Sequence, residues 1–390
     1  MKNIKNVNIY KKNIIIRSDL NVPIIKNKII SSERIDRSIN TIKYALKKKS
    51  KIILMSHLGR PTEGKFEEKY SLFPIFLYLK KKLHNVKITF HKNISEPIKI
   101  KYGEIALLEN VRFNIGESSN SKILSKKYAK LCEIFVMDAF GSAHRLQSST
   151  AGIIKFVKKT CIGILLESEI LSINKVLKNP KRPLVSIIGG SKISTKFKLL
   201  KSLGKISDKI IVGGGIANTF IAIKNEVGKS LYEKKFVKEA SKLLKQFNFF
   251  IPTDSRVGKE FSNNTVVKNR LVSNIKLNEE IMDIGKNSEK EIKKIIKKAN
   301  TIIWNGPLGV FEFSKFSNGT KTVAKSISEN NSFSIAGGGE TLAIINLLKL
   351  NKNISYISTG GGAFLEFLIN GTLPVIELIK KNKKQIKKVQ

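Results

Sequence analysis

The stretch Leu184-Val185-Ser186-Ile187-Ile188-Gly189-Gly190-Ser191-Lys192 shows the pattern that the whole chain repeats. A short apolar run ends in a glycine-rich break, and a longer segment of helical character follows. Short runs rich in Ile and Val, separated by helix-length segments, are typical of buried parallel strands in βαβ units. Further runs of this kind occur at Ile14–Ile16, Ile52–Met55, Ile105–Leu108, Ile134–Met137, Ile210–Val212, Ile302–Trp304, Phe333–Ala336 and Ile354–Ile357. The predicted fold class is therefore α/β, with doubly wound, Rossmann-like parallel sheets.

The length of the chain predicts two such domains. Its 390 residues exceed what one compact core organises, since domains usually hold roughly 150–200 residues. Leu165–Lys178 has the apolar spacing of one helix, which ends before Asn179-Pro180 because proline interrupts a helix. We therefore predict an N-terminal domain at residues 1–165, a linking hinge helix at 166–179 and a C-terminal domain at 180–371.

The composition is ordinary for a globular protein except for its charge. Hydrophobic residues make up 41% and charged residues 26%, but 72 Lys and Arg against 30 Asp and Glu give a net charge of +42. Such an excess favours a nucleic acid or an anionic membrane as partner. The lysines are spread along the chain instead of forming one stripe with aromatic residues, which favours a solvated surface. We expect no specific nucleic acid or membrane partner, and a nucleic-acid-binding protein stays open as the alternative of another class.

Neither the two cysteines nor the apolar runs of the sequence predict export or membrane insertion. Cys132 and Cys161 are too few for a disulfide framework and have no metal-ligand spacing. Cys132 lies in an apolar stretch, so we expect a small core residue. The N-terminus lacks the apolar region of a signal peptide, and no run reaches the roughly 18 apolar residues of a membrane span. We expect a cytoplasmic protein.

Basic and polar side chains follow the predicted strands of the first half. Ligands of open α/β sheets bind outside the carboxyl ends of the strands, so these side chains are candidates for a binding site. Guanidinium groups bind phosphate and carboxylate bidentately, as a small and multiply anionic substrate requires. Each arginine alone is equally compatible with a salt bridge, but arginine is scarce in this lysine-rich chain. The candidates are Asp19, Asn21, Arg34, His57, Arg60, Arg112 and Arg145.

Glycine-rich breaks follow the strands of the second half, where backbone N–H groups at helix starts favour phosphate. The segment Val227-Gly228-Lys229-Ser230 ends like a Walker A loop, but Ile223 stands where the first glycine is required. The G-x-G-x-x-G pattern fails too, because Asn218 and Leu342 occupy its third glycine positions. A dinucleotide-binding dehydrogenase is disfavoured, and a nucleotide site of another design stays open.

Two lysines and one glutamate in these breaks point to a phosphate chain. Lys192 and Lys196 are one helical turn apart, so both ammonium groups are expected along the same helix face. Glu340 follows three glycines, where a carboxylate can hold Mg²⁺ on phosphates. Alternatively, Glu340 favours the first turn of its helix through the helix dipole.

Several of these motifs resemble those of phosphoglycerate kinases. In the first half they are Arg17-Ser18-Asp19-Leu20-Asn21-Val22-Pro23, Ser56-His57-Leu58-Gly59-Arg60-Pro61, Glu109-Asn110-Val111-Arg112-Phe113 and Asp138-Ala139-Phe140-Gly141-Ser142-Ala143-His144-Arg145. In the second half they are Gly189-Gly190-Ser191-Lys192, Gly213-Gly214-Gly215-Ile216-Ala217-Asn218-Thr219-Phe220, Trp304-Asn305-Gly306-Pro307 and Ser358-Thr359-Gly360-Gly361-Gly362-Ala363. The similarity runs in family order from about residue 10 to about residue 378.

The resemblance implies the roles of the candidate residues. The 3-phosphoglycerate site would consist of Asp19, Asn21, Arg34, His57, Leu58, Gly59, Arg60, Arg112 and Arg145. The nucleotide site would consist of Lys192, Lys196, Gly213, Gly214, Asn305, Glu312, Gly338, Gly339, Glu340 and Thr341, with Glu340 also on Mg²⁺. Residues 372–390 would return to pack on the N-terminal domain, with a frayed lysine-rich end after Ile379.

The activity that the resemblance implies is reversible phosphoryl transfer from 1,3-bisphosphoglycerate to MgADP, which gives 3-phosphoglycerate and MgATP. Arg34, Lys192 and Lys196 would meet the charge of the transferred group, and a monomer with hinge closure is expected. One position departs from the family: Glu340 stands where an aspartate is usual. The longer side chain places direct magnesium coordination in doubt, which leaves an inactive scaffold as a second alternative.

Overall fold

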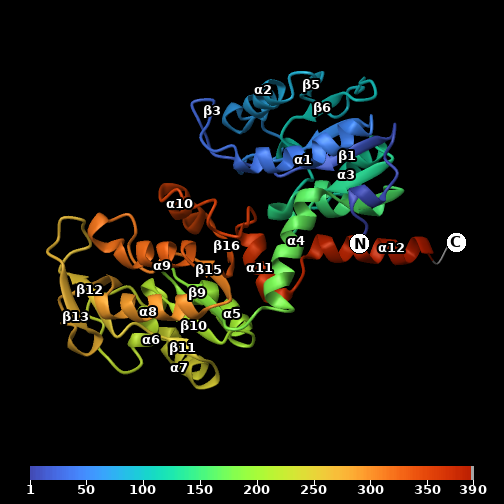
Figure 1. Cartoon of the computed structure of the whole chain (residues 1–390). Helices are drawn as coiled ribbons and strands as arrows, with labels where there is room; N and C mark the ends of the chain where they lie inside the picture. Colours follow the sequence, from blue (N-terminus) through green and yellow to red (C-terminus); the bar gives the residue numbers. More distant parts are fainter. Residues whose placement is uncertain (388–390) are drawn as a thin grey trace. The chain divides into compact units, whose positions relative to one another are not determined.

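The computed structural model describes residues 1–387 and divides the chain into two compact units (Figure 1). Unit 1 comprises Met1–Leu171 together with the chain from Thr372 onward, and unit 2 comprises Ser172–Gly371. The division falls inside helix α4, Ile164–Leu177. This helix lies within one residue of the helix predicted from the sequence, and the boundary between the units lies inside the segment expected to link them.

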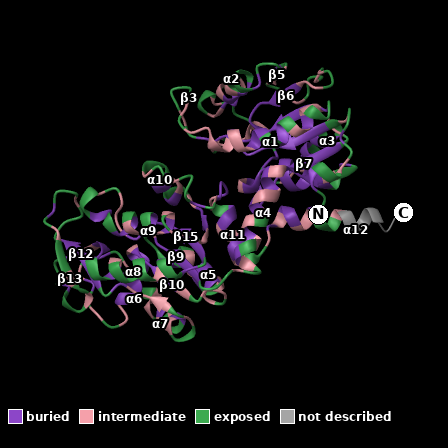
Figure 2. Ribbon diagram, in the orientation of Figure 1, coloured by how far each residue is buried: buried purple, intermediate pink, exposed green. Residues whose placement is uncertain are grey.

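Unit 1 is built on a parallel sheet with the strand order β5-β6-β4-β1-β7-β8. Its central strands carry Ile, Leu, Val and Met at successive positions and are buried along almost their whole length (Figure 2). Such strands are shielded on both faces, so they need no alternation of polar and apolar residues. The strands are β1 Asn13–Arg17, β4 Lys51–Met55, β5 Ile88–His91, β6 Ile105–Leu108, β7 Ile134–Met137 and β8 Lys159–Ile162, with a small hairpin of β2 Ile24–Ile25 and β3 Lys28–Ile29.

The helices of unit 1 bury one apolar face each. In α1, Glu33–Lys47, the buried residues Ile35, Ile39 and Ile42 recur at helical spacing. The other helices are α2 Phe73–Lys82, α3 Lys122–Lys130 and the C-terminal α12 Pro374–Lys387.

The C-terminal helix α12 belongs to unit 1. The Val375 N–H donates to the Ala143 carbonyl at 3.1 Å, and the Asn382 amide donates to the Ile154 carbonyl at 2.9 Å. Its helix continues to Lys387, so the expectation of a frayed end after Ile379 is wrong for the residues up to Lys387. The last part of that expectation, residues 388–390, lies outside the described residues.

Unit 2 has a second parallel sheet, with the order β11-β10-β9-β15-β16-β17. Its first strand, β9, pairs with β10 on one side and with β15 on the other. The strand order therefore reverses between β9 and β15, which is the place where doubly wound folds bind their ligands. The strands are β9 Leu184–Ile188, β10 Lys209–Val212, β11 Phe249–Phe250, β15 Thr301–Asn305, β16 Phe333–Ala336 and β17 Tyr356–Ile357.

Helices and a small antiparallel sheet complete unit 2. The sheet has the order β13-β12-β14, formed by β12 Asp254–Gly258, β13 Lys268–Leu271 and β14 Glu280–Ile284. The helices are α5 Ile193–Gly204, α6 Gly214–Ile221, α7 Val237–Gln246, α8 Lys286–Lys298, α9 Asn318–Ser328, α10 Gly339–Leu347 and α11 Gly362–Asn370.

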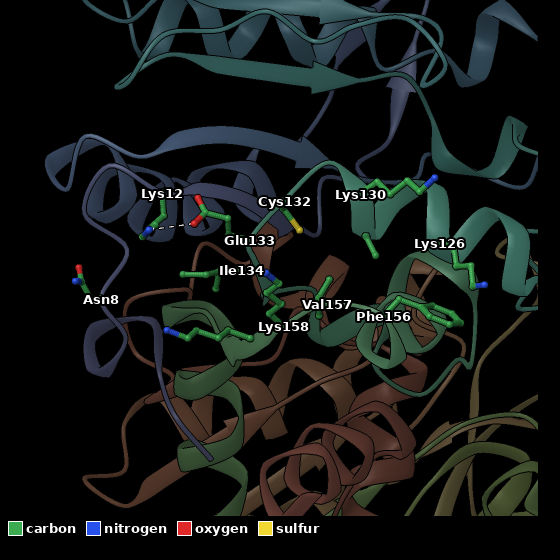
Figure 3. Close-up of a pocket in the computed structure, with 12 residues that line it drawn as sticks. Asn8, Lys12, Lys126, Lys130, Cys132, Glu133, Ile134, Phe156, Val157 and Lys158 are labelled. Atoms are coloured by element: carbon green, nitrogen blue, oxygen red, sulfur yellow. Dashed lines mark hydrogen bonds and ion pairs between the residues drawn. The ribbon is translucent and has the colours of Figure 1, made fainter. Parts of the chain in front are cut away.

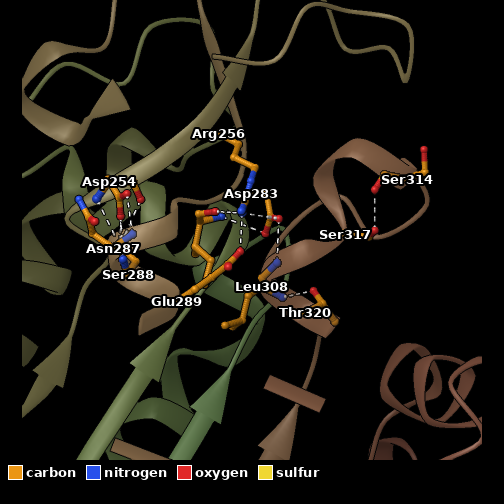
Figure 4. Close-up of polar contacts among 12 residues, drawn as sticks. Asp254, Arg256, Asp283, Asn287, Ser288, Glu289, Leu308, Ser314, Ser317 and Thr320 are labelled. Carbon is orange, nitrogen blue, oxygen red and sulfur yellow. Dashed lines mark hydrogen bonds and ion pairs between the residues drawn. The ribbon is translucent and has the colours of Figure 1, made fainter. Parts of the chain in front are cut away.

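A buried ion-pair cluster joins this small sheet to α8 (Figure 4). Arg256 Nη1 lies 3.3 Å from Asp283 Oδ2 and 2.5 Å from Glu289 Oε1. Burial raises the pKa of Asp283 to about 7, although the Gly319 N–H and Arg256 act in the opposite direction. Beside it, Asp254 accepts hydrogen bonds from the Asn287 and Ser288 N–H groups and so holds the start of α8.

The predicted fold class is confirmed, and each apolar run named in the sequence overlaps a strand of a parallel sheet. The missed strands of the parallel sheets are edge strands: β5 and β8 contain polar residues, and β11 has only two residues. Among the described residues no single helix is both long and apolar enough to cross a membrane, and only α11 and α12, taken together as a bent pair, pass such a test.

Candidate functional site

The carboxyl ends of β1 and β4 bring together polar side chains of unit 1. Asp19 follows β1 and is buried, and His57 follows β4 and is also buried. Between them, the Asn21 side-chain oxygen accepts a hydrogen bond from the Gly59 N–H at 3.0 Å. Gly59 has a φ of +59°, and a Cβ there would lie 2.3 Å from the Tyr70 ring. Only glycine fits this turn, which keeps the loop from Leu58 to Arg60 close to β1.

Arg34 lies beside the same loop, at the start of α1. Its Nη1 donates to the Asn21 carbonyl at 2.9 Å and lies 3.6 Å from Asp19 Oδ1. The Arg34 side chain is 28% exposed, whereas Asp19 is 1% exposed. The Arg34 side chain is therefore partly accessible from the solvent.

His57 is a neutral hydrogen-bond donor in this site. Arg17, at the end of β1, approaches His57 Nδ1 through its Nη2 at 3.2 Å. Because a guanidinium only donates, Nδ1 must accept, and the ring hydrogen resides on Nε2. Burial lowers the pKa of His57 well below its ordinary value, and Arg17, Arg112, Arg145 and Arg34 lower it further.

Three further arginines line a cavity of 260 Å³ in unit 1: Arg60, Arg112 and Arg145, together with Pro61, Glu63, Ser118 and Gln147. Arg112 also donates to the Gly59 carbonyl. Burial and then the nearby Arg145 and Arg17 lower the pKa of Arg112 to about 10, and burial and Arg60 lower that of Arg145. Like charges this close favour an anion between them. The cavity can therefore bind a phosphate or carboxylate.

A second cavity, of 310 Å³, lies at the strand-order reversal of unit 2. Six of the predicted nucleotide-site residues line it: Lys196, Asn305, Gly338, Gly339, Glu340 and Thr341, with Gly306, Gly361, Gly362 and Leu365. Five of its lining residues are glycines, so backbone N–H groups reach the cavity without side chains in the way. It lies at the N-terminus of α10, where the helix dipole also favours an anion.

The shape of this cavity depends on tight backbone contacts. The Gly306 N–H donates to Thr341 Oγ1 at 2.8 Å, and the Asn305 amide donates to the Gly337 carbonyl at 2.6 Å. Gly338 has a φ of +103°, and a Cβ there would lie 2.5 Å from the Asn305 amide nitrogen. Within the described residues the buried Oδ1 of Asn305 has no hydrogen-bond partner, which leaves one acceptor for a ligand.

The two predicted phosphate lysines differ in their surroundings. Lys196, in the first turn of α5, donates to the Gly189 carbonyl at 2.6 Å, and burial lowers its pKa to about 8 while Glu340 acts in the opposite direction. Lys192 precedes α5 with extended backbone and is exposed. The expectation of two lysines on one helix face is therefore wrong, because only Lys196 lies inside the helix.

The remaining predicted residues lie outside the lining of this cavity. Gly213 and Gly214 begin α6, and a Cβ on Gly213 would lie 2.4 Å from Leu308 Cδ2, so the backbone there packs closely on Leu308. Glu312 is exposed in the turn after Leu308. Glu340, in contrast, lines the cavity; it is exposed in the first turn of α10, where it also complements the helix dipole.

The cavity of unit 2 fits a magnesium ion only together with phosphates. Within residues 1–387 there is no group of three or more His, Cys, Asp or Glu side chains able to hold a metal. Glu340 is the carboxylate of the cavity lining. Mg²⁺ is commonly held by one or two carboxylates plus substrate phosphates and water, and this donor set matches that arrangement.

A cavity of 660 Å³ lies at the opposite edge of the unit 1 sheet (Figure 3). Its lining includes Lys12, Ile134 and Lys159, which stand at the amino ends of β1, β7 and β8. Lys12 forms a 3.0 Å ion pair with Glu133 there. Because ligands of such sheets bind at the carboxyl ends, we assign this cavity no part in the site.

Comparison with known proteins identifies the family of the chain. The family model described as phosphoglycerate kinase matches residues 4–371. The chain belongs to the phosphoglycerate kinase family.

Phosphoglycerate kinases of two subspecies of Buchnera aphidicola are similar over nearly their whole length. The enzyme of Buchnera aphidicola subsp. Schizaphis graminum is 58% identical over 384 residues, which are 98% of this chain and 99% of that protein. The enzyme of the Baizongia pistaciae subspecies is 56% identical over 379 residues, or 97% and 96% of the two chains.

Solved structures of phosphoglycerate kinases have the same fold. That from Coxiella burnetii has a TM-score of 0.91 at 42% identity and covers 97% of this chain and 99% of its own. That from Pyrococcus horikoshii OT3 has a TM-score of 0.84 at 29% identity and covers 98% and 100%.

Several residues of the site in this phosphoglycerate kinase family member were not selected from the sequence. Arg17 lay in a quoted motif, directly after the predicted run Ile14–Ile16, but was not among the candidate residues. Glu117 and Ser149 carry no motif signal, although each is fully buried. A glutamate in a glycine- and serine-rich loop gave no indication of burial, and only the tertiary structure brings it to Arg17.

Proposed function

We propose that the protein catalyses the reversible transfer of a phosphoryl group from 1,3-bisphosphoglycerate to MgADP, which gives 3-phosphoglycerate and MgATP. The observation that carries the proposal is the group of arginines at the carboxyl edge of the unit 1 sheet, together with a neutral histidine donor. Their positive charge exceeds that of the carboxylates around them, which suits a small molecule with a phosphate and a carboxylate. Membership in the phosphoglycerate kinase family supports this proposal.

The proposed 3-phosphoglycerate site lies in unit 1. The arginine-lined cavity of Arg60, Arg112 and Arg145 would take the phosphate, because guanidinium forks match its oxygens. Arg34, His57 and Asn21 would face the carboxyl end, with Asp19 orienting Arg34. Leu58 and Gly59 would contribute backbone contacts.

The proposed nucleotide site lies in unit 2. Lys196 and the N-terminus of α10 at Gly338, Gly339 and Thr341 would hold the phosphates, with Lys192 reaching the transferred group. Gly213 and Gly214 would line the adenine pocket, while Asn305 and Glu312 would also contact the nucleotide, Glu312 at the ribose. Although burial lowers the pKa of Lys196 to about 8, the amine is still mostly protonated near neutral pH, and a bound phosphate would favour that charged form.

The chemistry requires positioning and charge stabilisation more than proton transfer. The acceptor carboxylate of 3-phosphoglycerate is already ionised near neutral pH, so no side chain has to act as a base. The transition state is loose and spreads charge over the equatorial oxygens of the phosphoryl group. Arg34, Lys192 and Lys196 are the groups that we propose to stabilise this charge.

Glu340, with Asn305 in the same cavity, would hold Mg²⁺ through the phosphates of the nucleotide. When bound, the ion neutralises charge on the phosphate oxygens. The departure from the usual aspartate lengthens the side chain by one methylene, and the exposed position of Glu340 leaves it room to adjust.

We further propose that the protein works as a cytoplasmic monomer whose two units close over the substrates. Closure would exclude water, which otherwise accepts the phosphoryl group. The proposal includes no specific nucleic acid or membrane partner, because the positive charge is spread along the chain.

A coupled assay for ATP-dependent phosphorylation of 3-phosphoglycerate, with magnesium titrated, tests the function. We expect robust turnover, and Glu340→Asp should change the magnesium concentration for half-maximal rate by no more than about threefold, because one methylene is a small change in an exposed chain. Turnover only in Glu340→Asp would place a defect at the metal site. A folded protein inactive in both forms would contradict the proposal and favour a nucleic-acid-binding protein, whose binding would depend steeply on salt.

A further inference from the structure

A hydrogen-bonded chain of four buried side chains runs from Glu117 to His57 in unit 1. Ser149 Oγ donates to Glu117 Oε1 at 2.5 Å, and the Ser149 N–H donates to Glu117 Oε2 at 3.1 Å. Arg17 Nε donates to Ser149 Oγ at 3.0 Å, and Arg17 Nη2 approaches His57 Nδ1 at 3.2 Å. His57, at 5% exposed, is the most accessible member, and the other three are 0% exposed.

The chemistry of the groups fixes the direction of every hydrogen bond in this chain. A serine hydroxyl has one hydrogen, which points to the Glu117 carboxylate, so its lone pairs face Arg17. The remaining Arg17 group, Nη1, donates to the Ser18 carbonyl at 2.9 Å. Each of the three nitrogens of the guanidinium therefore has a partner, and its plane is fixed relative to the histidine ring.

When ionised, Glu117 also supplies the opposing charge for a guanidinium that has left water. Burial raises the pKa of Glu117 to about 7, while the hydrogen bond from Ser149 and the charge of Arg17 act in the opposite direction. Burial lowers the pKa of Arg17, and among the influences that raise it again the charge of Glu117 is the largest, ahead of Asp19. A buried charge without compensation is costly. Without Glu117, Ser149 would be free to turn its hydrogen toward Arg17, and the guanidinium would lose both its acceptor and its counter-charge.

We propose that Glu117 and Ser149 are positioning residues of the anion site: they orient Arg17, and Arg17 holds His57 as the neutral imidazole with its hydrogen on Nε2. His57 then always presents its Nε2–H donor to the substrate and never an unprotonated Nε2, which could only accept a hydrogen bond. This inference rests on the proposed function, since it concerns the 3-phosphoglycerate site.

Nitrogen-15 NMR of the histidine rings tests the inference without an activity measurement. The chain has four histidines, and the signals of His57 are identified by their loss in His57→Gln. In the wild type we expect His57 to remain neutral with hydrogen on Nε2 between about pH 6 and pH 8. In Glu117→Gln and Ser149→Ala we expect a mixture of the two neutral tautomers or an imidazolium, and Ser149→Thr, which keeps the hydroxyl, should restore the wild-type signals.

Steady-state kinetics provide the functional readout. In both variants we expect KM for 3-phosphoglycerate to rise about tenfold or more, the cost of a disturbed hydrogen bond to a charged group, with KM for ATP unchanged. The matched control is Ser148→Ala, which removes a neighbouring buried hydroxyl that bonds the Gly116 carbonyl at 2.8 Å and not Arg17. It should leave both the His57 signals and KM for 3-phosphoglycerate as they are.

The outcomes separate this inference from the proposed function. An active wild type whose His57 signals and KM for 3-phosphoglycerate are unchanged in Glu117→Gln and Ser149→Ala would overturn the inference. Equal increases of both KM values would also overturn it, because they indicate general loosening of the fold. A wild type inactive with 3-phosphoglycerate but with the expected His57 changes would remove the proposed function and leave the positioning of His57 supported.

Discussion

Unit 1 and unit 2 each bury an arginine among ionisable side chains, and the two surroundings differ in their charge balance. In unit 2, Arg256 has two carboxylates within 3.3 Å, Asp283 and Glu289. In unit 1, among the described residues, Arg17, Arg60, Arg112 and Arg145 form no ion pair within 4.0 Å. Arg34 reaches Asp19, at 3.6 Å.

The difference distinguishes a structural cluster from a binding site. The charge of Arg256 is neutralised by carboxylates of the protein, so it is not available to bind an anionic ligand. The arginines of unit 1 repel one another, as the lowered pKa values of Arg112 and Arg145 indicate. Repulsion between these guanidinium groups lowers the stability of the folded protein, and a bound anion would compensate for it by neutralising their charge.

The largest effect that we expect from this comparison is on catalysis. Arg34→Ala should lower turnover by roughly 10²–10³-fold, because it removes one donor that stabilises the charge of the transition state. The free energy of unfolding should change little, since the relief of repulsion among the arginines offsets the loss of the 3.6 Å pair with the buried Asp19. Steady-state kinetics and urea unfolding measure the two quantities.

Arg37→Ala is the matched control for Arg34, one helical turn further along α1. Arg37 pairs with Glu33 on the surface of that helix at 3.5 Å, and turnover should remain close to that of the wild type. ATP affinity should be nearly intact in both variants. A loss of ATP affinity as large as the loss of turnover in Arg34→Ala would rule out the role proposed for Arg34.

The second effect is on stability and belongs to unit 2. Arg256→Met should lower the free energy of unfolding by about 3–5 kcal/mol, because it leaves Asp283 and Glu289 without their cation. Asp283 can take up a proton near neutral pH, since its pKa is already raised to about 7, so the lower end of this range is expected. KM for 3-phosphoglycerate should not change.

Arg270→Met provides the comparison for Arg256 within the same small sheet. Arg270 pairs with Glu279 at 2.9 Å; Arg270 is 26% exposed and Glu279 is 3% exposed. Because water still reaches the guanidinium, its loss should cost clearly less than the loss of Arg256, which is 7% exposed. Equal destabilisation by the two substitutions in urea unfolding would show that burial of the arginine does not determine how much its ion pair contributes to the free energy of unfolding.

The same contrast explains how much the sequence could predict. The inner strands of the two parallel sheets were predictable because burial on both faces requires a continuous apolar run, as at Ile134–Met137. The edge strands β5, β8 and β11 were missed. Strand β12 was not predictable, because its ladder is formed by Asp254, Ser255 and Arg256, whose burial depends on partners about 30 residues away in α8 and β14.

The site was predictable where a motif encodes local geometry. The glycines around Asn305 and Gly338 mark tight contacts that any larger residue would disturb, and the arginines stand at strand ends. Glu117 and Ser149 were not predictable, because they act through Arg17 and leave no pattern of their own along the chain. Lys192 was placed on a helix face by its spacing, but α5 begins one residue later.

The smallest effect concerns Asp138, a buried carboxylate of unit 1 that no guanidinium neutralises. Its Oδ1 accepts a hydrogen bond from the Leu166 N–H at 3.1 Å near the start of α4, and within the described residues its buried Oδ2 has no hydrogen-bond partner. Burial raises the pKa of Asp138 to about 7, and the charge of Asp19 adds to this. The folded state therefore binds the proton more tightly than the unfolded state, in which an aspartate has a pKa of about 4.

The sign of the pH dependence follows from this difference. Between about pH 4 and pH 7 the folded state holds more protons at Asp138, so this residue makes the free energy of unfolding fall as the pH rises. Asp138→Asn keeps an oxygen acceptor for the Leu166 N–H and cannot titrate. In urea unfolding the variant should match the wild type near pH 4 and become the more stable of the two by pH 8.

Asp208→Asn should show the opposite pH dependence of stability relative to the wild type. It therefore tests whether the hydrogen-bond partners of a carboxylate set the sign of its pH dependence. Burial raises the pKa of Asp208, but the hydrogen bonds from the Leu184 N–H and Arg182 together outweigh it, so the pKa lies below its ordinary value. The wild type should therefore gain stability over Asp208→Asn as the pH rises through about 4. If Asp138→Asn is instead less stable than the wild type at pH 8, the ionised carboxylate of Asp138 stabilises unit 1. A buried carboxylate without a neighbouring guanidinium would then not be unfavourable.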